Sequence, residues 1–409
     1  MKNSKIISLV LFVGITTSFA CFTSRAMDGE SPKIGAPFSD DFDRKQQAHK
    51  STCDFYKDWR IYTVLTFKGS RITSCAMSPD GSLLVHALKK GGVEFTTASN
   101  GKTITLEGNN TYSPTRVACS PKAPQVATGE SLHTGGHRLR IYWGLDTLGK
   151  INGVKNIHEP MPDAIRSLCY THDGHAIAIG LDDGSAHLRK LTDIDHVAKQ
   201  FLLDKNQTLD SEPIEALACI DNNTFCCGLN KSLVLFDTRA EGAASRIPGH
   251  MSRISRVATS SMYPTLLASS AYDRTVKLWD LHKNTARWTG QDDAVTSALA
   301  MHPRYEHVIM GNKDGTMTIA GGRDAMGFAE TYDAPISDIA TTRDGDYIMS
   351  ASSNGIYKIY GTTKSITALC ERWKKADAEE GVGAGAGEGM KNIKKRKRQQ
   401  PTQPSADDD

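Results

Sequence analysis

A fixed spacing between a turn residue and an aromatic residue recurs along the middle of the chain. Asp273 precedes Trp279 by six positions, and further pairs of residues share this offset. These pairs are His137 and Trp143, Asn230 and Phe236, and Asn354 and Tyr360. Asp183 and Arg189, and Asp314 and Ala320, keep the offset but lose the aromatic residue. The turn positions follow one another at intervals of about 40 to 47 residues. Self-similarity at such a period indicates one small structural unit repeated along the chain.

The clearest unit spans residues 249–281 and has the composition of a small antiparallel sheet. Its β-branched, aromatic and aliphatic residues favour strands, and its polar and proline-containing stretches favour turns. We expect strands Ile254–Thr259, Leu266–Ser270 and Thr275–Trp279, with turns at Tyr263–Pro264 and Tyr272–Arg274.

This unit strongly resembles a WD repeat, which carries Gly-His at its start and Trp-Asp near its end. Gly249-His250 and Trp279-Asp280 occupy those places. The resemblance implies a hydrogen-bonded tetrad in which His250 sits between Asp273 and Ser269, and Ser269 also reaches Trp279. We expect this set to be structural rather than catalytic, because a nucleophilic serine must be exposed to its substrate.

The other units keep the spacing with weaker motifs, and together they predict an all-β fold. Seven units begin near Ile72, Thr115, Ile165, Ile214, Ile254, Val295 and Ile336. The resemblance implies a seven-bladed β-propeller of WD-type four-stranded blades, in which radial packing buries the blade faces. The strand Ile61–Phe67 precedes the first unit, and we expect it to close the ring as the outer strand of the last blade. Residues Ser365–Trp373 are the alternative for that strand, and the sequence leaves the choice open.

The first 20 residues have the pattern of an export signal. Lys2 and Lys5 precede an apolar run over residues 6–15, and Ser18-Phe19-Ala20 ends the segment with small residues at the two positions that a signal peptidase reads. The run is shorter than the roughly 20 residues that span a bilayer. We therefore expect a cleaved signal, no transmembrane segment in the mature chain, and a periplasmic or secreted protein. Lipid attachment at Cys21 is the alternative.

The remaining chain divides by composition into a linker, a folded region and a tail. Residues 21–58 form a polar linker, residues 59–373 the propeller, and residues 374–409 a Gly/Ala-rich and basic tail that cannot bury a core and should be disordered. The tail contains six basic residues typical of a nuclear-localisation or nucleic-acid patch: Lys391, Lys394, Lys395, Arg396, Lys397 and Arg398. The formal net charge of +3 is small, so any nucleic acid would bind only through this tail. A solvated basic run without a partner is the alternative interpretation.

Residues that could carry other chemistry have simpler structural interpretations. Cys75, Cys119, Cys169 and Cys219 recur at similar places in successive units, where we expect small buried fillers rather than disulfides. His172 and His175 flank Asp173 in a predicted turn, and His133, His137 and Asp182-Asp183 likewise lack the spacing of a metal site. The sequence contains no nucleophile elbow, P-loop or HExxH motif. No cofactor or metal is predicted.

Fold and flanks together predict a monomeric, non-enzymatic scaffold for protein–protein interaction that is exported from the cytoplasm. WD propellers present partner-binding loops on a rigid frame. The alternative is an exported propeller enzyme or small-ligand binder with its site at the central channel. The turn Ser78–Gly81 is also similar to turns of periplasmic propellers of the TolB type, but the complete Gly-His to Trp-Asp pattern of residues 249–280 belongs to the WD family.

Overall fold

A computed structural model describes residues 62–66 and most of 71–361. The gaps are residues 90, 98–102, 107–111, 133–134, 145–150, 152, 158–160, 195–196, 198, 203–211, 241–242, 261 and 322–323, and beyond 361 only Ser365, Ala368 and Glu371 are described. Apart from the 3-10 turn η1 (Leu191–Asp193), the described elements are β-strands. Over this part of the chain, no helix has the length and apolar character needed to cross a membrane.

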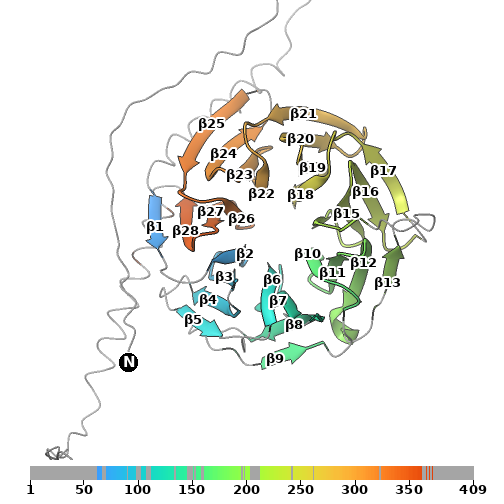
Figure 1. Cartoon of the computed structure of the whole chain (residues 1–409), viewed down its shortest axis with the longest axis vertical. Coiled ribbons are helices and arrows are strands. Elements are labelled where there is room, and N and C mark those ends of the chain that lie inside the picture. Colours follow the sequence, from blue (N-terminus) through green and yellow to red (C-terminus); the bar gives the residue numbers. More distant parts are fainter. Residues whose placement is uncertain are drawn as a thin grey trace, which may run out of the picture.

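Seven antiparallel sheets of four strands each are arranged in a ring, as Figure 1 shows. Blade 1 contains β2 (Ile72–Met77), β3 (Leu83–Leu88), β4 (Val93–Thr97) and β5 (Thr103–Leu106). Blade 2 contains β6 (Tyr112–Cys119), β7 (Gln125–Leu132), β8 (His137–Trp143) and β9 (Gly153–Asn156). Blade 3 contains β10 (Ile165–Tyr170), β11 (Ala176–Leu181), β12 (Ser185–Lys190) and β13 (Lys199–Leu202). Blade 4 contains β14 (Ala216–Cys219), β15 (Thr224–Leu229), β16 (Ser232–Asp237) and β17 (Ala243–Pro248). Blade 5 contains β18 (Ile254–Ser260), β19 (Tyr263–Ala271), β20 (Thr275–Asp280) and β21 (Thr285–Gln291). Blade 6 contains β22 (Thr296–Met301), β23 (Val308–Asn312), β24 (Thr316–Gly321) and β25 (Asp324–Thr331). Blade 7 contains β26 (Ile336–Thr341), β27 (Tyr347–Ser352), β28 (Ile356–Gly361) and β1 (Tyr62–Thr66).

The seven-bladed β-propeller predicted from the repeat is therefore confirmed, and its inner strands begin within three residues of the expected starts. One local expectation was wrong. Tyr263 and Pro264 do not form a turn but open the strand β19, with Tyr263 paired to Ser260 across an irregular register. The connection between β18 and β19 is shorter than the polar and proline residues suggested, because a strand start tolerates proline as well as a turn does.

The ring is closed by the N-terminal strand. β1 pairs antiparallel with β28, with Tyr62 opposite Tyr360 and Thr66 opposite Ile356, so the two ends of the described chain share blade 7. β1 therefore takes the place for which residues 365–373 were the alternative. Because β1 occupies the outer edge of β28, the first and last parts of the propeller are joined by main-chain hydrogen bonds.

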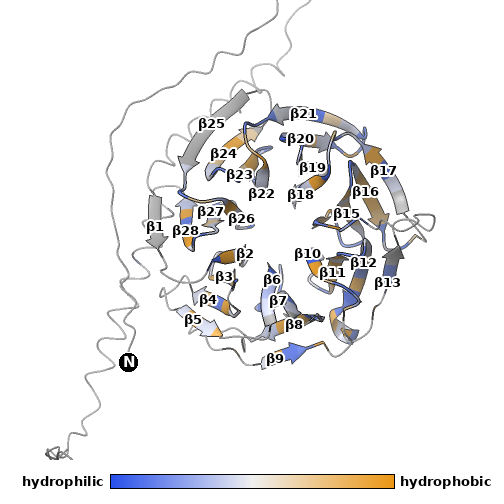
Figure 2. Cartoon of the chain, viewed as in Figure 1, coloured by the Kyte–Doolittle hydropathy of each residue, from blue (hydrophilic) through white to orange (hydrophobic). Residues whose placement is uncertain are grey.

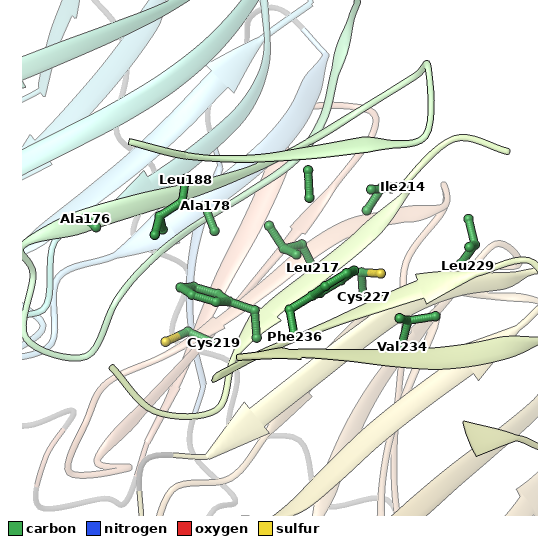
Figure 3. Close-up of a cluster of buried hydrophobic side chains, with 12 residues drawn as sticks. Ala176, Ala178, Leu188, Ile214, Leu217, Cys219, Cys227, Leu229, Val234 and Phe236 are labelled. Carbon is green, nitrogen blue, oxygen red and sulfur yellow. The ribbon is translucent and has the colours of Figure 1, made fainter. Parts of the chain in front are cut away.

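The hydrophobic core lies between neighbouring blades and not within one of them. The cluster in Figure 3 joins Ala178 and Leu188 of blade 3 to Leu217, Phe225 and Phe236 of blade 4. Corresponding clusters connect the other blades, including blades 5 and 6 and blades 7 and 1. Figure 2 shows the outer strand β9 as hydrophilic, whereas the neighbouring strand β8 carries hydrophobic residues that are buried. Each blade thus needs both neighbours to bury its faces.

Hydroxyl side chains near the start of the inner strands also connect one blade to the next. Six of them donate to a main-chain carbonyl at the start of the following inner strand: Thr73 to Pro114 (3.0 Å), Thr115 to Ile165 (3.1 Å), Ser167 to Ile214 (2.7 Å), Ser255 to Thr296 (3.2 Å), Ser297 to Ile336 (2.6 Å) and Ser337 to Ile72 (2.9 Å). The last of these joins blade 7 to blade 1. The hydrogen bonds therefore continue across the closure of the ring.

The four recurring cysteines all lie on inner strands, as expected from their places in the repeat. Cys75 and Cys219 are buried, Cys119 and Cys169 are partly buried, and all four are free thiols. Burial raises the pKa of Cys119 and Cys219 to about 12, so both thiols are protonated at neutral pH.

Candidate functional site

The two ends of the ring carry different connections. The antiparallel order of each blade places the turn between its second and third strands at the same end as the connection from the preceding blade. We call this end the top face, and the end with the first-to-second and third-to-fourth strand connections the bottom face. In blade 5 the top face consists of residues 249–253 and 271–275, which are joined by the hydrogen bond from Tyr272 N to Arg253 O (2.9 Å).

The four residues of the predicted tetrad lie together under this part of the top face. His250 Nε2 is 2.7 Å from Ser269 Oγ, and Trp279 Nε1 donates to the same oxygen at 2.7 Å. His250 Nδ1 lies 3.4 Å from Asp273 Oδ2 and 3.0 Å from Thr275 Oγ1. Thr275 is thus a further member of the network, which the sequence motif did not indicate.

Asp273 holds the two top-face segments of blade 5 together. One carboxylate oxygen accepts from Met251 N (2.7 Å), and the other accepts from Thr275 N (2.9 Å) and Thr275 Oγ1 (2.6 Å). Burial alone would raise the pKa of Asp273, but these hydrogen bonds and the neighbouring His250 bring it below its ordinary value. Asp273 is therefore an ionised clamp at neutral pH.

The histidine is a neutral member of the network. Desolvation lowers the pKa of His250 below its ordinary value despite the opposing effect of Asp273. Ser269 is fully buried and both of its neighbours in the network use its oxygen, so no substrate could reach it. Gly249 completes the packing, because a Cβ atom there would lie 2.2 Å from Trp279 Cη2.

Blade 7 contains a related network that the sequence analysis missed. Tyr332 stands four residues before Ile336, as His250 stands four before Ile254. Its hydroxyl contacts both Ser350 Oγ and Tyr360 Oη, the latter at 2.6 Å. Ser350 precedes Tyr360 by ten residues, as Ser269 precedes Trp279. These matching offsets were the available signal, but tyrosine in place of histidine concealed it.

The other blades keep only parts of the network. In blade 6, Asn312 Nδ2 donates to Asp292 Oδ2 (2.7 Å) and to Thr316 Oγ1 (2.9 Å). In blade 2 the six-residue offset points to the wrong residue. Trp143 is 38% exposed, compared with 3% for Trp279, and the buried aromatic ring of that strand belongs to Tyr142.

The surface above the tetrad carries an aromatic ring that two cations approach. Arg253 Cζ lies 5.3 Å and Lys313 Nζ 5.1 Å from the ring centre of Tyr272. Tyr272 Oη donates to Glu215 Oε2 (3.2 Å), and Arg253 Nη2 lies 3.0 Å from Glu215 Oε1. This cluster spans blades 4, 5 and 6. Beside it, Met251 is 82% exposed, although a methionine is apolar.

One residue of this surface has a strained main chain. Arg274 has φ +63°, in the left-handed region, and its side chain is exposed. The corresponding turns of blades 3, 6 and 7 carry glycine at this position, with φ of +77° (Gly184), +90° (Gly315) and +90° (Gly355). A non-glycine residue there costs about 1 kcal/mol. The Arg274 side chain donates from Nη1 to Asp293 O at 3.4 Å, a long and exposed hydrogen bond that offsets only part of this cost.

Other candidate residues from the sequence take part in local structure. Asp173 accepts from His175 N (2.9 Å), and Asp182 pairs with Arg166 Nε at 2.7 Å. His137 Nδ1 is 3.1 Å from Ser131 Oγ. In the part of the chain that the structure describes, no three His, Cys, Asp or Glu side chains are grouped to hold a metal ion. His133, Cys21 and the basic residues from Lys391 to Arg398 lie outside the described residues.

A polar pocket of about 410 Å³ lies at the bottom-face end of blade 5. Its lining residues are Asp280, Lys283, Thr285 and Arg287. Asp280 accepts from His282 N (3.0 Å) and Lys283 N (3.2 Å), so its carboxylate caps the turn that follows β20. The pocket is therefore built from a turn and an exposed outer strand, and it does not include the tetrad.

Comparison with known proteins places these features in context. Residues 244–280, which include the tetrad, match the family model described as WD domain, G-beta repeat. The chain is 22% identical over 305 residues to the 77 kDa echinoderm microtubule-associated protein of Lytechinus variegatus, covering 72% of this chain and 43% of that protein. It is 22% identical over 206 residues to autophagy-related protein 16 of Arabidopsis thaliana, covering 47% of this chain and 38% of that protein.

A shorter match of 110 residues, 28% identical, is to pre-mRNA-processing factor 19 of Caenorhabditis elegans and covers 26% of this chain and 22% of that protein. The chain thus spans less than half the length of these curated relatives. One repeat of the chain thus matches the WD-repeat family, and the seven four-stranded blades form the fold that the resemblance implied.

Proposed function

We propose that this propeller is an exported, non-enzymatic scaffold that docks a protein partner on the top face of blade 5. WD-repeat propellers generally mediate protein–protein interaction. The observation that carries the proposal is Arg274, an exposed arginine held at φ +63° where three other blades use glycine. Strained positions of this kind cluster at functional sites, where a gain in function offsets the loss in stability.

The neighbouring residues have the chemistry of an interaction surface. Tyrosine and arginine are enriched among the residues that dominate binding energy at interfaces, and methionine is also enriched there. Tyr272 is held by the nearby cations Arg253 and Lys313 and by its hydrogen bond to Glu215, so it is preorganised and loses little entropy on binding. The tetrad beneath fixes both loops, which is the arrangement of a binding loop on a rigid frame.

Substitution of Arg274 separates stability from binding. Arg274→Gly removes the strained residue, and we expect it to raise the melting temperature slightly while weakening partner binding at least tenfold. The measurement is thermal unfolding together with affinity capture and a titration of the captured partner. An Arg274→Gly variant that binds as tightly as the wild type would contradict the proposal.

Methionines at opposite ends of blade 5 provide a matched control. Met251 on the top face is 82% exposed, and Met262 on the bottom face is 63% exposed. Met251→Asp should abolish capture of the partner, whereas Met262→Asp should leave it intact. Equal effects of the two changes would show that binding does not depend on the top face.

Export is proposed from the pattern of the first 20 residues, with cleavage after Ala20. The N-terminal sequence of the mature protein should begin at Cys21, and a lipid on Cys21 would identify the anchored form instead. Retention of Met1 in an extracytoplasmic fraction would contradict cleavage.

We further propose that the basic tail acts apart from the propeller, so that any binding to nucleic acid weakens steeply with salt and is lost on removal of residues 374–409.

A further inference from the structure

The polar pocket at the bottom-face end of blade 5 lies on the hairpin that joins β20 to β21. Asp280 ends β20 and pairs with Thr285 at the start of β21, so the two side chains lie next to each other on one face of the hairpin. Lys283 lies in the connecting turn, and Arg287 follows on β21. The cavity of about 410 Å³ falls within the range of about 300–1,000 Å³ that is typical of small-molecule sites.

The carboxylate of Asp280 is fixed by the turn, and one of its oxygens is left over. Asp280 Oδ1 accepts from His282 N (3.0 Å) and Lys283 N (3.2 Å). Asp280 Oδ2, Lys283 Nζ and Thr285 Oγ1 make no hydrogen bond or ion pair with any residue that the structure describes. An ionised acceptor, an ammonium group and a hydroxyl group therefore line the cavity without protein partners in this part of the chain.

A β-bulge positions the fourth lining residue. The ladder between β20 and β21 skips Arg287, which is the extra residue of the bulge. Bulges change the direction of a side chain and are common next to functional sites. Arg287 Nη1 lies 2.9 Å from Oε2 of Glu306, on the blade 6 loop between β22 and β23. This ion pair holds one side of the guanidinium group, which has five N–H donors, more than a single carboxylate contact uses.

The corresponding hairpin of blade 4 has the same frame, but its carboxylate is fully used. Asp237 ends β16 as Asp280 ends β20, and the ladder between β16 and β17 also skips one residue, Ala244. Arg239 donates Nε to Asp237 Oδ1 (2.9 Å) and Nη2 to Asp237 Oδ2 (2.7 Å). Blade 5 has no arginine in that turn and carries Arg287 at the bulge instead. Only the blade 5 hairpin thus combines an unused carboxylate oxygen with cationic donors around a cavity.

The charges around the pocket balance, which decides the class of ligand. Asp280 offsets Lys283, and Glu306 offsets Arg287, so net charge favours neither an anion nor a cation. The four lining side chains are all polar, whereas sites for apolar ligands are lined mainly by apolar groups. A ligand hydroxyl both donates and accepts hydrogen bonds, so two neighbouring hydroxyls can satisfy the carboxylate and the cations at once.

We propose that this pocket is a binding site for a neutral sugar of the hexose class. One ring hydroxyl donates to Asp280 Oδ2, and its neighbour accepts from Lys283 Nζ or from the guanidinium group of Arg287. Hydrogen bonds to charged groups are the strong ones, and two of these groups are held in place before the sugar binds. The pocket lies at the opposite face from Tyr272 and Arg274, so the proposal does not depend on the protein partner.

Saturation-transfer NMR on the full chain tests the site, because it detects weak binding from the signals of the ligand. The probes are the methyl glycosides of glucose, galactose and mannose, and at least one should show saturable transfer. Asp280→Asn keeps an oxygen that can cap the turn but removes the charged acceptor, and Lys283→Gln removes a charged donor. Each should weaken binding at least tenfold. Asp237→Asn, at the same place in blade 4, is the control and should bind as the wild type does.

Three results would overturn the site. The first is the absence of saturable transfer from all three glycosides, and the second is equal binding by the wild type and Asp280→Asn. The third comes from inorganic phosphate as a competitor at varied ionic strength. An uncharged sugar should bind equally well at low and high salt. Phosphate that displaces the glycoside at low salt and loses this effect at high salt would show that the pocket recognises an anion and not a sugar.

Discussion

At the residue scale, the tetrad of blade 5 connects sequence to stability most directly. His250, Ser269 and Trp279 are joined by two hydrogen bonds to one serine oxygen, and Asp273 ties both top-face segments to them. The resemblance of residues 249–281 to a WD repeat implied these four residues. Thr275 and the Tyr332 network of blade 7 were not predicted, because neither the extra hydroxyl nor a tyrosine in the place of histidine belongs to the motif.

Substitutions in the tetrad should be costly and not additive. Asp273→Ala leaves buried donors without an acceptor, a loss of roughly 1–3 kcal/mol, and Trp279→Ala empties a buried aromatic site, about 3–5 kcal/mol. The double variant should lose less free energy of unfolding than the sum of the two single losses, because both residues belong to one network. Asp344→Ala, in an exposed bottom-face turn, serves as the control in denaturant unfolding. Losses as small as that of Asp344→Ala would show that the network does not stabilise the blade.

A second residue, His86, should make the protein sensitive to acid. His86 is fully buried on β3, its ring centre is 4.2 Å from that of Tyr357, and neither ring nitrogen has a hydrogen-bond partner among the described residues. Desolvation lowers its pKa from 6.5 to about 3. The fold favours the neutral ring, whereas the unfolded chain binds a proton at His86 below about pH 6.5. The contribution of His86 to the free energy of unfolding is therefore full above pH 6.5 and is lost as the pH falls toward 3.

Replacing His86 by phenylalanine should remove this part of the acid sensitivity. The ring and its contact with Tyr357 are retained, while no proton can bind in the unfolded state. We expect the loss of unfolding free energy between pH 7 and pH 5 to shrink by about 2 kcal/mol. His302 and His307, with pKa values lowered by burial to about 3 and 4, keep part of the dependence. The exposed His282→Phe is the control, and parallel pH profiles for the wild type and His86→Phe would refute this assignment.

At the element scale, the inner strands were the easiest to predict and the outer ones the hardest. Four inner strands open with a buried isoleucine, namely Ile72, Ile165, Ile254 and Ile336, because that residue lies between two blades. Outer strands such as β5 and β9 have only four residues and no fully buried side chain. A strand without a buried face leaves little alternation of polar and apolar residues to detect.

The closing strand β1 gives the element scale its own prediction. Removal of residues 1–69 deletes β1 and exposes the edge of β28, whose Tyr357 and Tyr360 are buried. We expect a lower melting temperature and concentration-dependent association, because an unpaired edge invites pairing with another chain. Removal of residues 1–58 alone should change neither. Size-exclusion chromatography and thermal unfolding distinguish the two truncations, and identical behaviour would show that the pairing of β1 with β28 does not stabilise the ring.

At the scale of the whole molecule, the ring places residues side by side that no local pattern connects. Asp338 of blade 7 binds Ser74 of blade 1 although 264 positions separate them in sequence. Ser337 of blade 7 likewise donates to Ile72 O of blade 1 at 2.9 Å. Sequence periodicity could therefore predict seven blades, but it could not predict which side chains would meet across the closure of the ring.

Closure should also make the blades unfold together. Every blade buries its faces against two neighbours, so damage to one should propagate around the ring, whereas in an open repeat array it would stay local. In Trp279→Ala, the denaturant midpoint for hydrogen exchange should fall by the same amount for residues 72–88 of blade 1 as for residues 254–271 of blade 5. Mass spectrometry of the two peptides gives both midpoints in one experiment. A midpoint that falls in blade 5 and stays unchanged in blade 1 would show that the blades are energetically independent despite the closed ring.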